Sequence, residues 1–357
     1  MRTREGRCIE SAFVLLMRVV DLFAGLGGFT CGALEAGALV VLVVDSDPAP
    51  LKVLAANAPT ATAVVATLGE GRDEVALPPP APDLHVHIST PCTELSVARR
   101  DDKANPDAGI RMIRWAVGLV LERGDHSWSL EQVPTKATRS LMTELATAHP
   151  ERIAYGVFDS AEFGAPQTRL RLIAGPPRLV RMLQAIPCAR HVSIRAAFEK
   201  AGTLLPAPRC KNQTKSQAGG PTMRPVETQS FTVCAGHALT WCDAVGKTVR
   251  IMTARESAHL MGFPSTWALP HGSRAAQRAI GNAMCVALSK AIMRAAIAVQ
   301  NGDASVPGEV DTVPTHSPAP TEKNPPTYRQ YRRLRRRIVE LEKLVRPTLH
   351  FDEVLED

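Results

Sequence analysis

The chain has 357 residues, of which 45% are apolar, and a formal net charge of +7 at neutral pH. This length and composition predict a large globular domain accompanied by a smaller one. Its eight cysteines include no C-x-x-C pair, which argues against a zinc site and indicates unpaired thiols of a reducing compartment. No apolar run has the length of a membrane span, so we expect a soluble intracellular protein, nuclear or cytoplasmic.

Residues 1–16 form an N-terminal extension, and from residue 18 onward strand and helix patterns alternate. Strands are predicted at 18–25, 39–47, 84–90, 127–133, 153–160 and 169–176, and helices at 26–38, 110–122 and 140–149. Such alternation predicts an α/β fold with a mostly parallel central sheet. Ligands of these sheets bind beyond the carboxyl ends of the strands, where the stretches DLFAG (21–25) and STPC (89–92) fall.

The alternation is lost over residues 178–249, which indicates a smaller inserted domain. Between residues 165 and 215 there are ten Lys or Arg residues and a single acidic one, Glu199. This concentration of positive charge predicts contacts with phosphates, with a solvated basic surface as the alternative. Helical patterns resume at 253–263 and 278–299.

The C-terminal part of the chain divides into two segments. Residues 301–327 are rich in Pro, Thr and Ser and predict a flexible linker. Residues 328–357 predict a basic amphipathic helix followed by an acidic tail. This helix suits a solvated surface, weak self-association or phosphate binding; otherwise we expect a monomer.

A glycine-rich turn follows the first strand, in the stretch DLFAGLGG (21–28). Glycines allow the backbone to approach a ligand closely, and a carboxylate at the end of the next strand accepts hydrogen bonds from ribose hydroxyls. Asp45 ends that next strand, 20 residues beyond Gly25. The pattern predicts a nucleotide-type cofactor, with a nicotinamide cofactor and a plain tight turn as alternatives.

Cys92 lies in TPCTELS (90–96), where it is either a nucleophile or an inert core thiol. Glu131 ends a later strand and is expected at the same edge of the sheet. Arg169 and Arg171 alternate along a strand and are expected to share a face, where their charge would favour a thiolate. These three residues favour the nucleophile. His85 and His87 also alternate, but no third ligand is evident and no metal is predicted.

These motifs, in this order, resemble those of the cytosine-5 DNA methyltransferases. The matching stretches are DLFAGLGGF (21–29), Asp45, TPCTELS (90–96), EQV (131–133), PQTRLR (166–171), RIMTARESAHLMGFP (250–264) and IGNAM (280–284). The chain departs from the family pattern at Thr93, usually Gln, and at Gln132, usually Asn. The third block, normally a Gly-Asp pair, is not recognisable.

The resemblance implies a Rossmann-like catalytic domain at 17–178 and 274–298 and a small basic target-recognition domain at 179–273. It also implies S-adenosylmethionine as cofactor. Phe23 would lie near the adenine, Asp45 on the ribose and Asn282 toward the methionine end. The remaining implied cofactor-binding residues are Gly25, Leu26, Gly27, Gly28 and Pro91.

The resemblance further implies a reaction on a cytosine rotated out of duplex DNA. Cys92 would attack carbon 6, and Glu131 would hold the exocyclic amine and nitrogen 3. Arg169 and Arg171 complete the implied catalytic set. The implied nucleic-acid contacts are Ser96, Arg99 and Arg100, in a loop (93–108) expected to close over the base, together with Gln167.

Two alternatives remain within this resemblance. A tRNA-modifying branch shares the catalytic motifs, although its Cys-Phe-Thr segment is only faintly echoed by SFTVC (230–234). A catalytically degenerate nucleic-acid-binding protein on the same scaffold would accommodate Gln132 and the missing third block.

Overall fold

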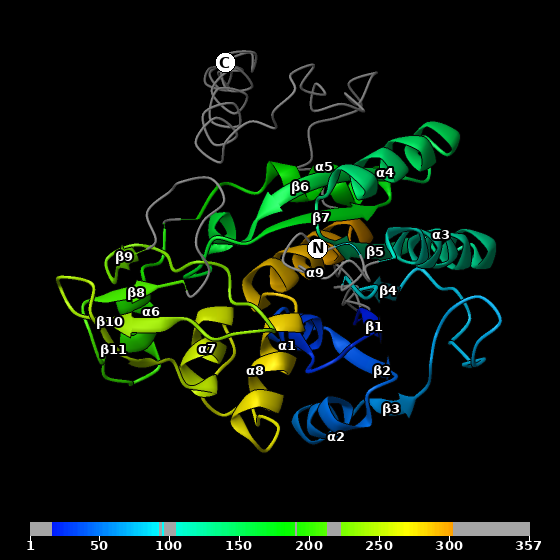
Figure 1. Ribbon diagram of the computed structural model, residues 1–357. Helices are drawn as coiled ribbons and strands as arrows, with labels where there is room; N and C mark the ends of the chain where they lie inside the picture. The colour runs from blue at the N-terminus through cyan, green and yellow to red at the C-terminus, as the bar shows by residue number, and fades with distance from the viewer. Residues whose placement is uncertain (1–15, 93–94, 96–104, 190, 213–222, 303–357) are drawn as a thin grey trace, which may run out of the picture. The chain divides into compact units, whose positions relative to one another are not determined.

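A seven-stranded sheet forms the centre of the computed structural model (Figure 1). Its strand order is β3-β2-β1-β4-β5-β7-β6, and β7 pairs antiparallel with both β5 and β6 while the other pairs are parallel. The strands are β1 (Arg18–Leu22), β2 (Leu39–Asp45), β3 (Thr62–Val65), β4 (Leu84–Ile88), β5 (Ser127–Gln132), β6 (Ala154–Asp159) and β7 (Leu170–Gly175). The predicted Rossmann-like, mostly parallel α/β fold is confirmed.

The structure describes residues 16–92, 95, 105–189, 191–212 and 223–302. The chain divides into two compact units, Met1–Asp311 and Thr312–Asp357. The second unit lies entirely outside the described residues. The predicted N-terminal extension, the linker from residue 303 onward and the tail helix are likewise outside them.

Helices cover both faces of the large sheet, and each face has its own apolar core. One core draws on α1 (Gly28–Glu35), α2 (Pro48–Asn57), α5 (Pro177–Ala185) and α9 (Val286–Gln300). The other draws on α3 (Pro106–Arg123) and α4 (Lys136–Ala148). The predicted 18–25, 39–47, 84–90 and 127–133 strands are therefore buried on both sides.

Local sequence signals set the ends of α3. The side chain of Asn105 accepts a hydrogen bond from the backbone of Ala108, and Pro106 occupies the first turn, where its missing N–H costs nothing. At the other end Gly124 adopts φ 75°, a left-handed conformation that terminates the helix. The helix thereby begins four residues before the predicted residue 110.

The helix predicted at 278–299 is wrong in one respect, because it is two helices. Helix α8 (Ser273–Asn282) ends before Ala283, and α9 begins at Val286. The backbone of Met284 in the break lies against Gly28 so closely that a Cβ at Gly28 would be 2.1 Å from the Met284 carbonyl oxygen. Sequence periodicity does not reveal such a contact between distant segments.

The stretch Ser273–Gln300, which contains both helices, has the length and hydropathy (1.4) of a membrane span. However, 61% of its most apolar window is buried inside the protein, and α9 packs against α1 and α5. Its apolar composition is therefore that of a core segment.

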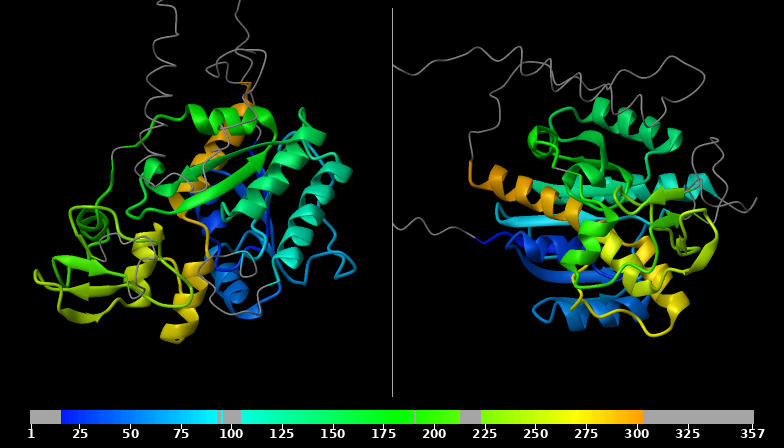
Figure 2. Two further views of the ribbon diagram at one scale, coloured as in Figure 1. Left: turned by 45° about the horizontal axis from the view of Figure 1, so that its top comes forward. Right: turned by 90° about the vertical axis from the view of Figure 1, so that its left-hand side faces the viewer.

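A second, antiparallel sheet, drawn in green to yellow-green in Figure 2, has the order β11-β10-β8-β9, and Figure 1 labels its strands. Its strands are β8 (Arg209–Lys211), β9 (Met223–Pro225), β10 (Thr240–Cys242) and β11 (Thr248–Ile251), accompanied by α6 (Ile194–Lys200) and α7 (Ala254–Met261). Phe198 of α6 packs edge-on against Trp241 of β10, with ring centroids 5.4 Å apart. Helix α5 packs instead against β6, β7 and α9, although the sequence placed residues 179–185 in the small domain.

Candidate active site

A pocket of about 420 Å³ opens where β1, β2, β4 and β5 end, a size typical of sites for small molecules and cofactors. Segments far apart in the sequence line it together. They include the glycine turn after β1, residues 45–47 at the end of β2, residues 89–92 after β4, Glu131 of β5, Arg169 and Arg171 at β7, and residues 282–284 at the end of α8 and just beyond it. The carboxyl edge of a parallel sheet is where the sequence placed these motifs.

The backbone of the glycine turn has two features that are typical of a ligand-binding site, a strained residue and a fixed carboxylate. Phe23 has φ 61°, the one described non-glycine residue with positive φ, and such strained residues gather at functional sites. The Gly25 N–H donates to Oδ2 of Asp45 at 2.8 Å. Burial raises the pKa of Asp45, and the backbone N–H groups of Asp47 and Gly25 partly offset it. These hydrogen bonds hold the Asp45 carboxylate at the pocket and leave lone pairs on its oxygens that can accept further hydrogen bonds.

Of the predicted cofactor-binding residues, Gly27 does not line the pocket. A Cβ on Gly27 would lie 2.2 Å from Leu54 and 3.2 Å from Trp267, so this glycine serves close packing beneath the turn. The other predicted residues do line it. They are Phe23, Gly25, Leu26, Gly28, Asp45, Pro91 and Asn282.

Asp21, which is not among the predicted site residues, also lines the pocket. Its Oδ2 accepts hydrogen bonds from the hydroxyl (2.6 Å) and backbone N–H (3.2 Å) of Thr30, whereas Oδ1 has no partner among the residues that the structure describes. Burial raises the pKa of Asp21 to about 7. The available signal was an acid directly after a buried apolar run, in a strand that otherwise reads as core.

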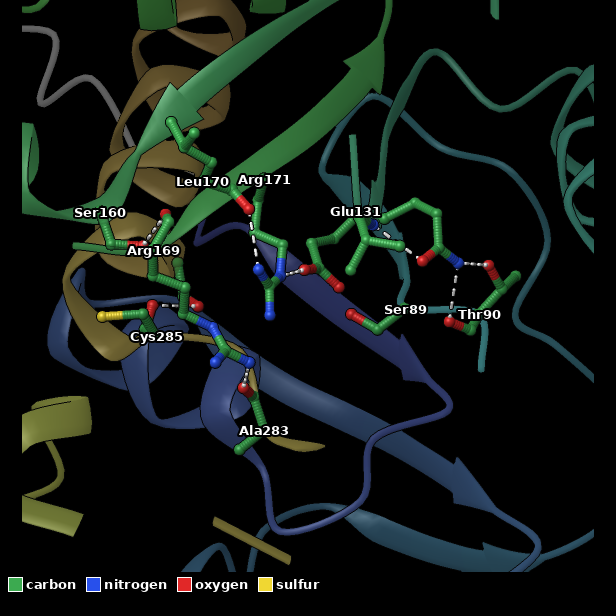
Figure 3. A network of polar contacts seen from close by, with 12 residues as sticks. Ser89, Thr90, Glu131, Ser160, Arg169, Leu170, Arg171, Ala283 and Cys285 are labelled. Carbon is green, nitrogen blue, oxygen red and sulfur yellow. Dashed lines mark hydrogen bonds and ion pairs between the residues drawn. The ribbon is translucent and has the colours of Figure 1, made fainter. Parts of the chain in front are cut away.

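Cys92, Glu131 and Arg171 lie in this one pocket, although 79 residues separate the first from the last. Arg171 forms an ion pair with Glu131 at 2.5 Å and donates to the Leu170 carbonyl at 2.7 Å (Figure 3). Burial raises the pKa of the Cys92 thiol, and the Glu131 charge raises it further, while the two arginines act in the opposite direction. The thiolate-favouring effect expected of the arginines is present and is outweighed by burial.

Gln132 connects the end of β5 to the Cys92 loop. Its amide nitrogen donates to the carbonyl (3.1 Å) and the hydroxyl (2.9 Å) of Thr90, and its amide oxygen accepts from the N–H of Val133 (Figure 3). Every hydrogen-bonding group of this buried side chain faces a partner. The side chain of Gln132, one methylene longer than Asn, is therefore accommodated by its contacts with Thr90, which lies two residues before Cys92.

Arg169 joins three parts of the chain. Its guanidinium donates to the carbonyls of Val233 (2.9 Å), Gly281 (3.1 Å) and Ala283 (2.9 Å), and the side chain is buried. Burial and the charge of Arg171 lower the pKa of Arg169. The side chain borders the pocket, but its polar contacts hold the segment after α8 and the small-sheet region onto β7.

Gln167 does not occupy the position predicted for it. The side chain is fully buried, donates to the Leu260 carbonyl at 2.8 Å and accepts from the Val233 N–H at 3.0 Å. Its amide is committed to these backbone partners, so the prediction of a nucleic-acid contact is corrected. The other predicted nucleic-acid contacts, Ser96, Arg99 and Arg100, lie outside the described residues.

Comparisons with known proteins agree with this geometry. A family model described as C-5 cytosine-specific DNA methylase matches residues 17–175 and 194–298, most of the chain. A comparison with curated protein sequences gives no match. Among solved structures, a protein assigned as a DNA modification methyltransferase encoded within an E. coli prophage has a TM-score of 0.55 at 17% identity, covering 78% of this chain and 98% of its own.

Two further structures are similar. A DNMT2 mutant from Spodoptera frugiperda has a TM-score of 0.49 at 14% identity, with 78% of this chain and 99% of that chain covered. The S. pombe Dnmt2 methyltransferase has a TM-score of 0.48 at 17% identity, with coverage of 78% and 97%. At these identities the structural likeness shows the fold alone.

The pocket residues fit the cofactor of this family. The glycine turn leaves its backbone open to a ligand, and Asp45 can accept from ribose hydroxyls. The Oδ1 of Asp21 is a buried acceptor with no partner in the described part of the chain. The chain therefore belongs to the C-5 cytosine-specific DNA methylase family, a family of methyltransferases that act on nucleic acid with S-adenosylmethionine.

Proposed function

We propose that this protein is a DNA cytosine-5 methyltransferase that works through a covalent bond between Cys92 and the target base. The observation that carries the proposal is the meeting of Cys92 and Glu131, from the segments ending β4 and β5, in the same pocket as the glycine turn. A thiol and a carboxyl at one end of a cofactor pocket suit nucleophilic attack on a ring that must be activated.

The proposed reaction begins with a cytosine rotated out of the duplex, because carbons 5 and 6 are inaccessible in the stack. Cys92 reacts as the thiolate: its sulfur forms a bond to carbon 6, and the electrons of the broken carbon 5–carbon 6 π bond make carbon 5 nucleophilic. Carbon 5 would then take the methyl group that S-adenosylmethionine supplies, and the cofactor sulfur would keep the electrons of the broken sulfur–methyl bond. Loss of the carbon 5 proton restores the double bond and expels the Cys92 thiolate.

The surrounding residues have proposed roles that follow from their contacts. Glu131 orients the base through its amine and nitrogen 3, and Arg171 orients Glu131 through the ion pair. Gln132 holds the Thr90 end of the nucleophile loop, and Arg169 closes the pocket by anchoring the chain after α8. The predicted cofactor-binding residues that line the pocket, which are all of them except Gly27, bind S-adenosylmethionine.

Double-stranded DNA is the proposed substrate. The matching family is described as acting on DNA. Of the ten basic residues between 165 and 215, Arg169 and Arg171 are held by protein partners, and the other eight would neutralise phosphates. We propose that the DNA lies between a catalytic domain, residues 17–178 and 274–298, and a small domain, residues 179–273. Because α5 packs against β6, β7 and α9, we propose that the small domain begins after residue 185.

Trapping on a fluorinated base tests this function. Duplex DNA containing 5-fluorocytosine is incubated with S-adenosylmethionine and the wild type, Cys92→Ala or Cys188→Ala. Fluorine at carbon 5 blocks the final elimination, so a denaturation-resistant protein–DNA complex is expected. It should form with the wild type but not with Cys92→Ala. Cys188→Ala, which loses an exposed thiol outside the pocket, is the matched control and should form the complex like the wild type.

The same incubation with 5-fluorocytosine tRNA compares the two polymers. A complex on tRNA and none on duplex DNA would overturn the assignment of substrate and leave the chemistry intact. Methylation of ordinary substrate by Cys92→Ala would remove Cys92 from the reaction. Wild-type protein that binds cofactor and yields no adduct on either polymer would establish a non-catalytic role.

A further inference from the structure

A row of alternating serine and histidine side chains runs through the sheet beneath the pocket. The Ser127 hydroxyl lies 2.8 Å from Nδ1 of His85, and Nε2 of His85 lies 2.8 Å from the Ser129 hydroxyl. The Ser129 hydroxyl lies 2.7 Å from Nδ1 of His87, and Nε2 of His87 lies 2.8 Å from the Ser89 hydroxyl. The five side chains form one continuous hydrogen-bonded row.

The row follows from strand register. β4 and β5 are parallel, with His85 paired to Ser127 and His87 paired to Ser129, so these side chains share one face. Phe29 of α1 stacks on the His87 ring with centroids 3.5 Å apart and an interplanar angle of 5°. Rings clamped in this way keep both nitrogens on the line of hydroxyls.

The two ends of the row lie in different surroundings. Ser89 lines the pocket that contains Cys92 and Glu131, and in Figure 3 its hydroxyl points toward the Glu131 side chain. Ser127 begins β5 at the opposite edge of the sheet and is half-buried. The three residues between them are fully buried. The row therefore connects the pocket with the far edge through the protein interior.

Both histidines rest in the neutral form. Burial lowers the pKa of His85 to about 3 and holds that of His87 well below its usual value. A neutral imidazole has one N–H donor and one acceptor nitrogen, and a hydroxyl has both functions. All four hydrogen bonds can thus point the same way, with Ser89 donating to His87 and each later member donating onward to Ser127. This is the arrangement that a proton relay requires.

We propose that Ser89, His87, Ser129, His85 and Ser127 form a proton wire that carries the proton released at carbon 5 of the target base out of the pocket. The inference rests on the proposed function, since replacing hydrogen by methyl at carbon 5 releases one proton in each turnover. The histidines and Ser129 are positioning residues, because among the five only Ser89 borders the pocket.

The transfer balances as a concerted relay. The carbon 5–hydrogen bond breaks, its electron pair forms the carbon 5–carbon 6 double bond, and the carbon 6–sulfur bond breaks to leave Cys92 as thiolate. The proton passes to the Ser89 oxygen as the original Ser89 proton passes to Nε2 of His87. Each later member accepts one proton and releases another, and Ser127 releases the last one to solvent. Because a charged imidazole is disfavoured there, the proton is transmitted and not stored.

Matched substitutions at Ser129 separate a relay from a packing role. Ser129→Thr keeps the hydroxyl and Ser129→Val replaces it with a methyl group of similar volume, so both variants impose the same change of shape. Ser127→Ala breaks the wire at its far end, remote from the pocket. Ser289→Ala is the control for loss of a buried serine hydroxyl outside the row.

The measurement follows a single turnover on duplex DNA that carries tritium at carbon 5 of cytosine. The S-adenosylmethionine carries a carbon isotope label in its methyl group. Methyl incorporation reports the steps before proton loss, and tritium release reports proton loss itself. For Ser129→Val and Ser127→Ala we expect methyl incorporation at the wild-type rate and tritium release slowed by at least about tenfold, with methylated adduct accumulating. Ser129→Thr and Ser289→Ala should release tritium like the wild type.

Release of tritium at the wild-type rate by Ser127→Ala and Ser129→Val would overturn the wire. So would equal slowing of methyl incorporation and tritium release, since that result marks a packing role. If Ser129→Val does not fold, Ser127→Ala alone decides. Failure of the proposed function is distinguishable, because then the wild type itself incorporates no methyl group.

Discussion

Glu131 of β5 and Arg171 of β7 form an ion pair of 2.5 Å beside Cys92, with their side chains 13% and 12% exposed. The antiparallel register of β5 and β7, which pairs Gln132 with Leu172, brings the two residues together. The negative charge of Glu131 raises the pKa of the Cys92 thiol, and the positive charge of Arg171 lowers it. Each charge can therefore be removed separately to test its effect on Cys92.

The first prediction concerns the reactivity of Cys92. Glu131→Gln removes a negative charge that raises the pKa of the thiol, so alkylation of Cys92 should become several-fold faster near neutral pH. Arg171→Gln removes an opposing positive charge, so alkylation should become several-fold slower. The measurement is the rate of iodoacetamide labelling of the Cys92 peptide by mass spectrometry. Labelling of the exposed Cys188, followed in the same samples, should not change. Equal rates in both variants would show that the two charges do not govern the thiol.

The second prediction concerns the link between Gln132 and Thr90. Gln132→Leu removes two hydrogen bonds to Thr90 and leaves buried groups unsatisfied, so it should slow methyl transfer by about tenfold or more through displacement of the Cys92 loop. Binding of S-adenosylmethionine, measured by calorimetry, should stay near the wild-type value. The matched variant Thr90→Val removes only the hydroxyl contact and keeps the carbonyl one, so a smaller loss is expected. Unchanged methyl transfer in Gln132→Leu would contradict a positioning role.

The third prediction concerns stability at Arg169. Arg169→Met leaves the buried carbonyls of Val233, Gly281 and Ala283 without these donors, which should lower the free energy of unfolding by about 2–4 kcal/mol. Arg195→Met is the control, because the ion pair of Arg195 with Glu227 is exposed and its loss should lower the free energy of unfolding far less. Urea unfolding measures both. Similar losses in the two variants would refute the assignment of Arg169 as a clamp.

The fourth prediction concerns pH. The pKa of Asp21 in the folded protein, about 7, exceeds its ordinary value of 3.8. At a pH between these two values the folded protein therefore keeps a proton that the unfolded chain has released. This contribution to stability is complete below pH 3.8 and is lost as the pH rises through about 7. Asp21→Asn has no such loss. Between about pH 5 and about pH 8 the wild type should lose on the order of 3 kcal/mol relative to the variant in urea unfolding. Parallel pH profiles for the two proteins would show that Asp21 ionises at its ordinary pKa.

Much of the fold was predictable from local pattern. The strands at β1, β2, β4 and β5 are apolar runs followed by turn or cap residues, and their alternation with helices fixed the sheet class. Strand β3 was missed because it has four residues, and the small sheet was missed because its strands have three or four residues each. Runs of that length carry no readable period.

The candidate site was predictable where a motif ends a strand, and not where burial decides the outcome. Cys92, Glu131 and Asp45 follow from the rule that ligands bind at carboxyl ends of strands. Gln167 was misassigned because alternation along the PQTRLR segment predicts on which face of the strand a side chain lies but not how deeply it is buried. The break at Met284 depends on Gly28, more than 250 residues away in the chain.

By itself the sequence determined the class of sheet, the order of motifs along it and the residue types available for chemistry, because these depend on local pattern. Only the tertiary structure decided which polar groups form hydrogen bonds within the fold and which face the pocket. Arg169 and Gln167 are held by backbone carbonyls, whereas Asp21 and Ser89 reach the pocket. Hydrogen-bond partners and desolvation arise from segments brought together by folding, and no local pattern specifies them.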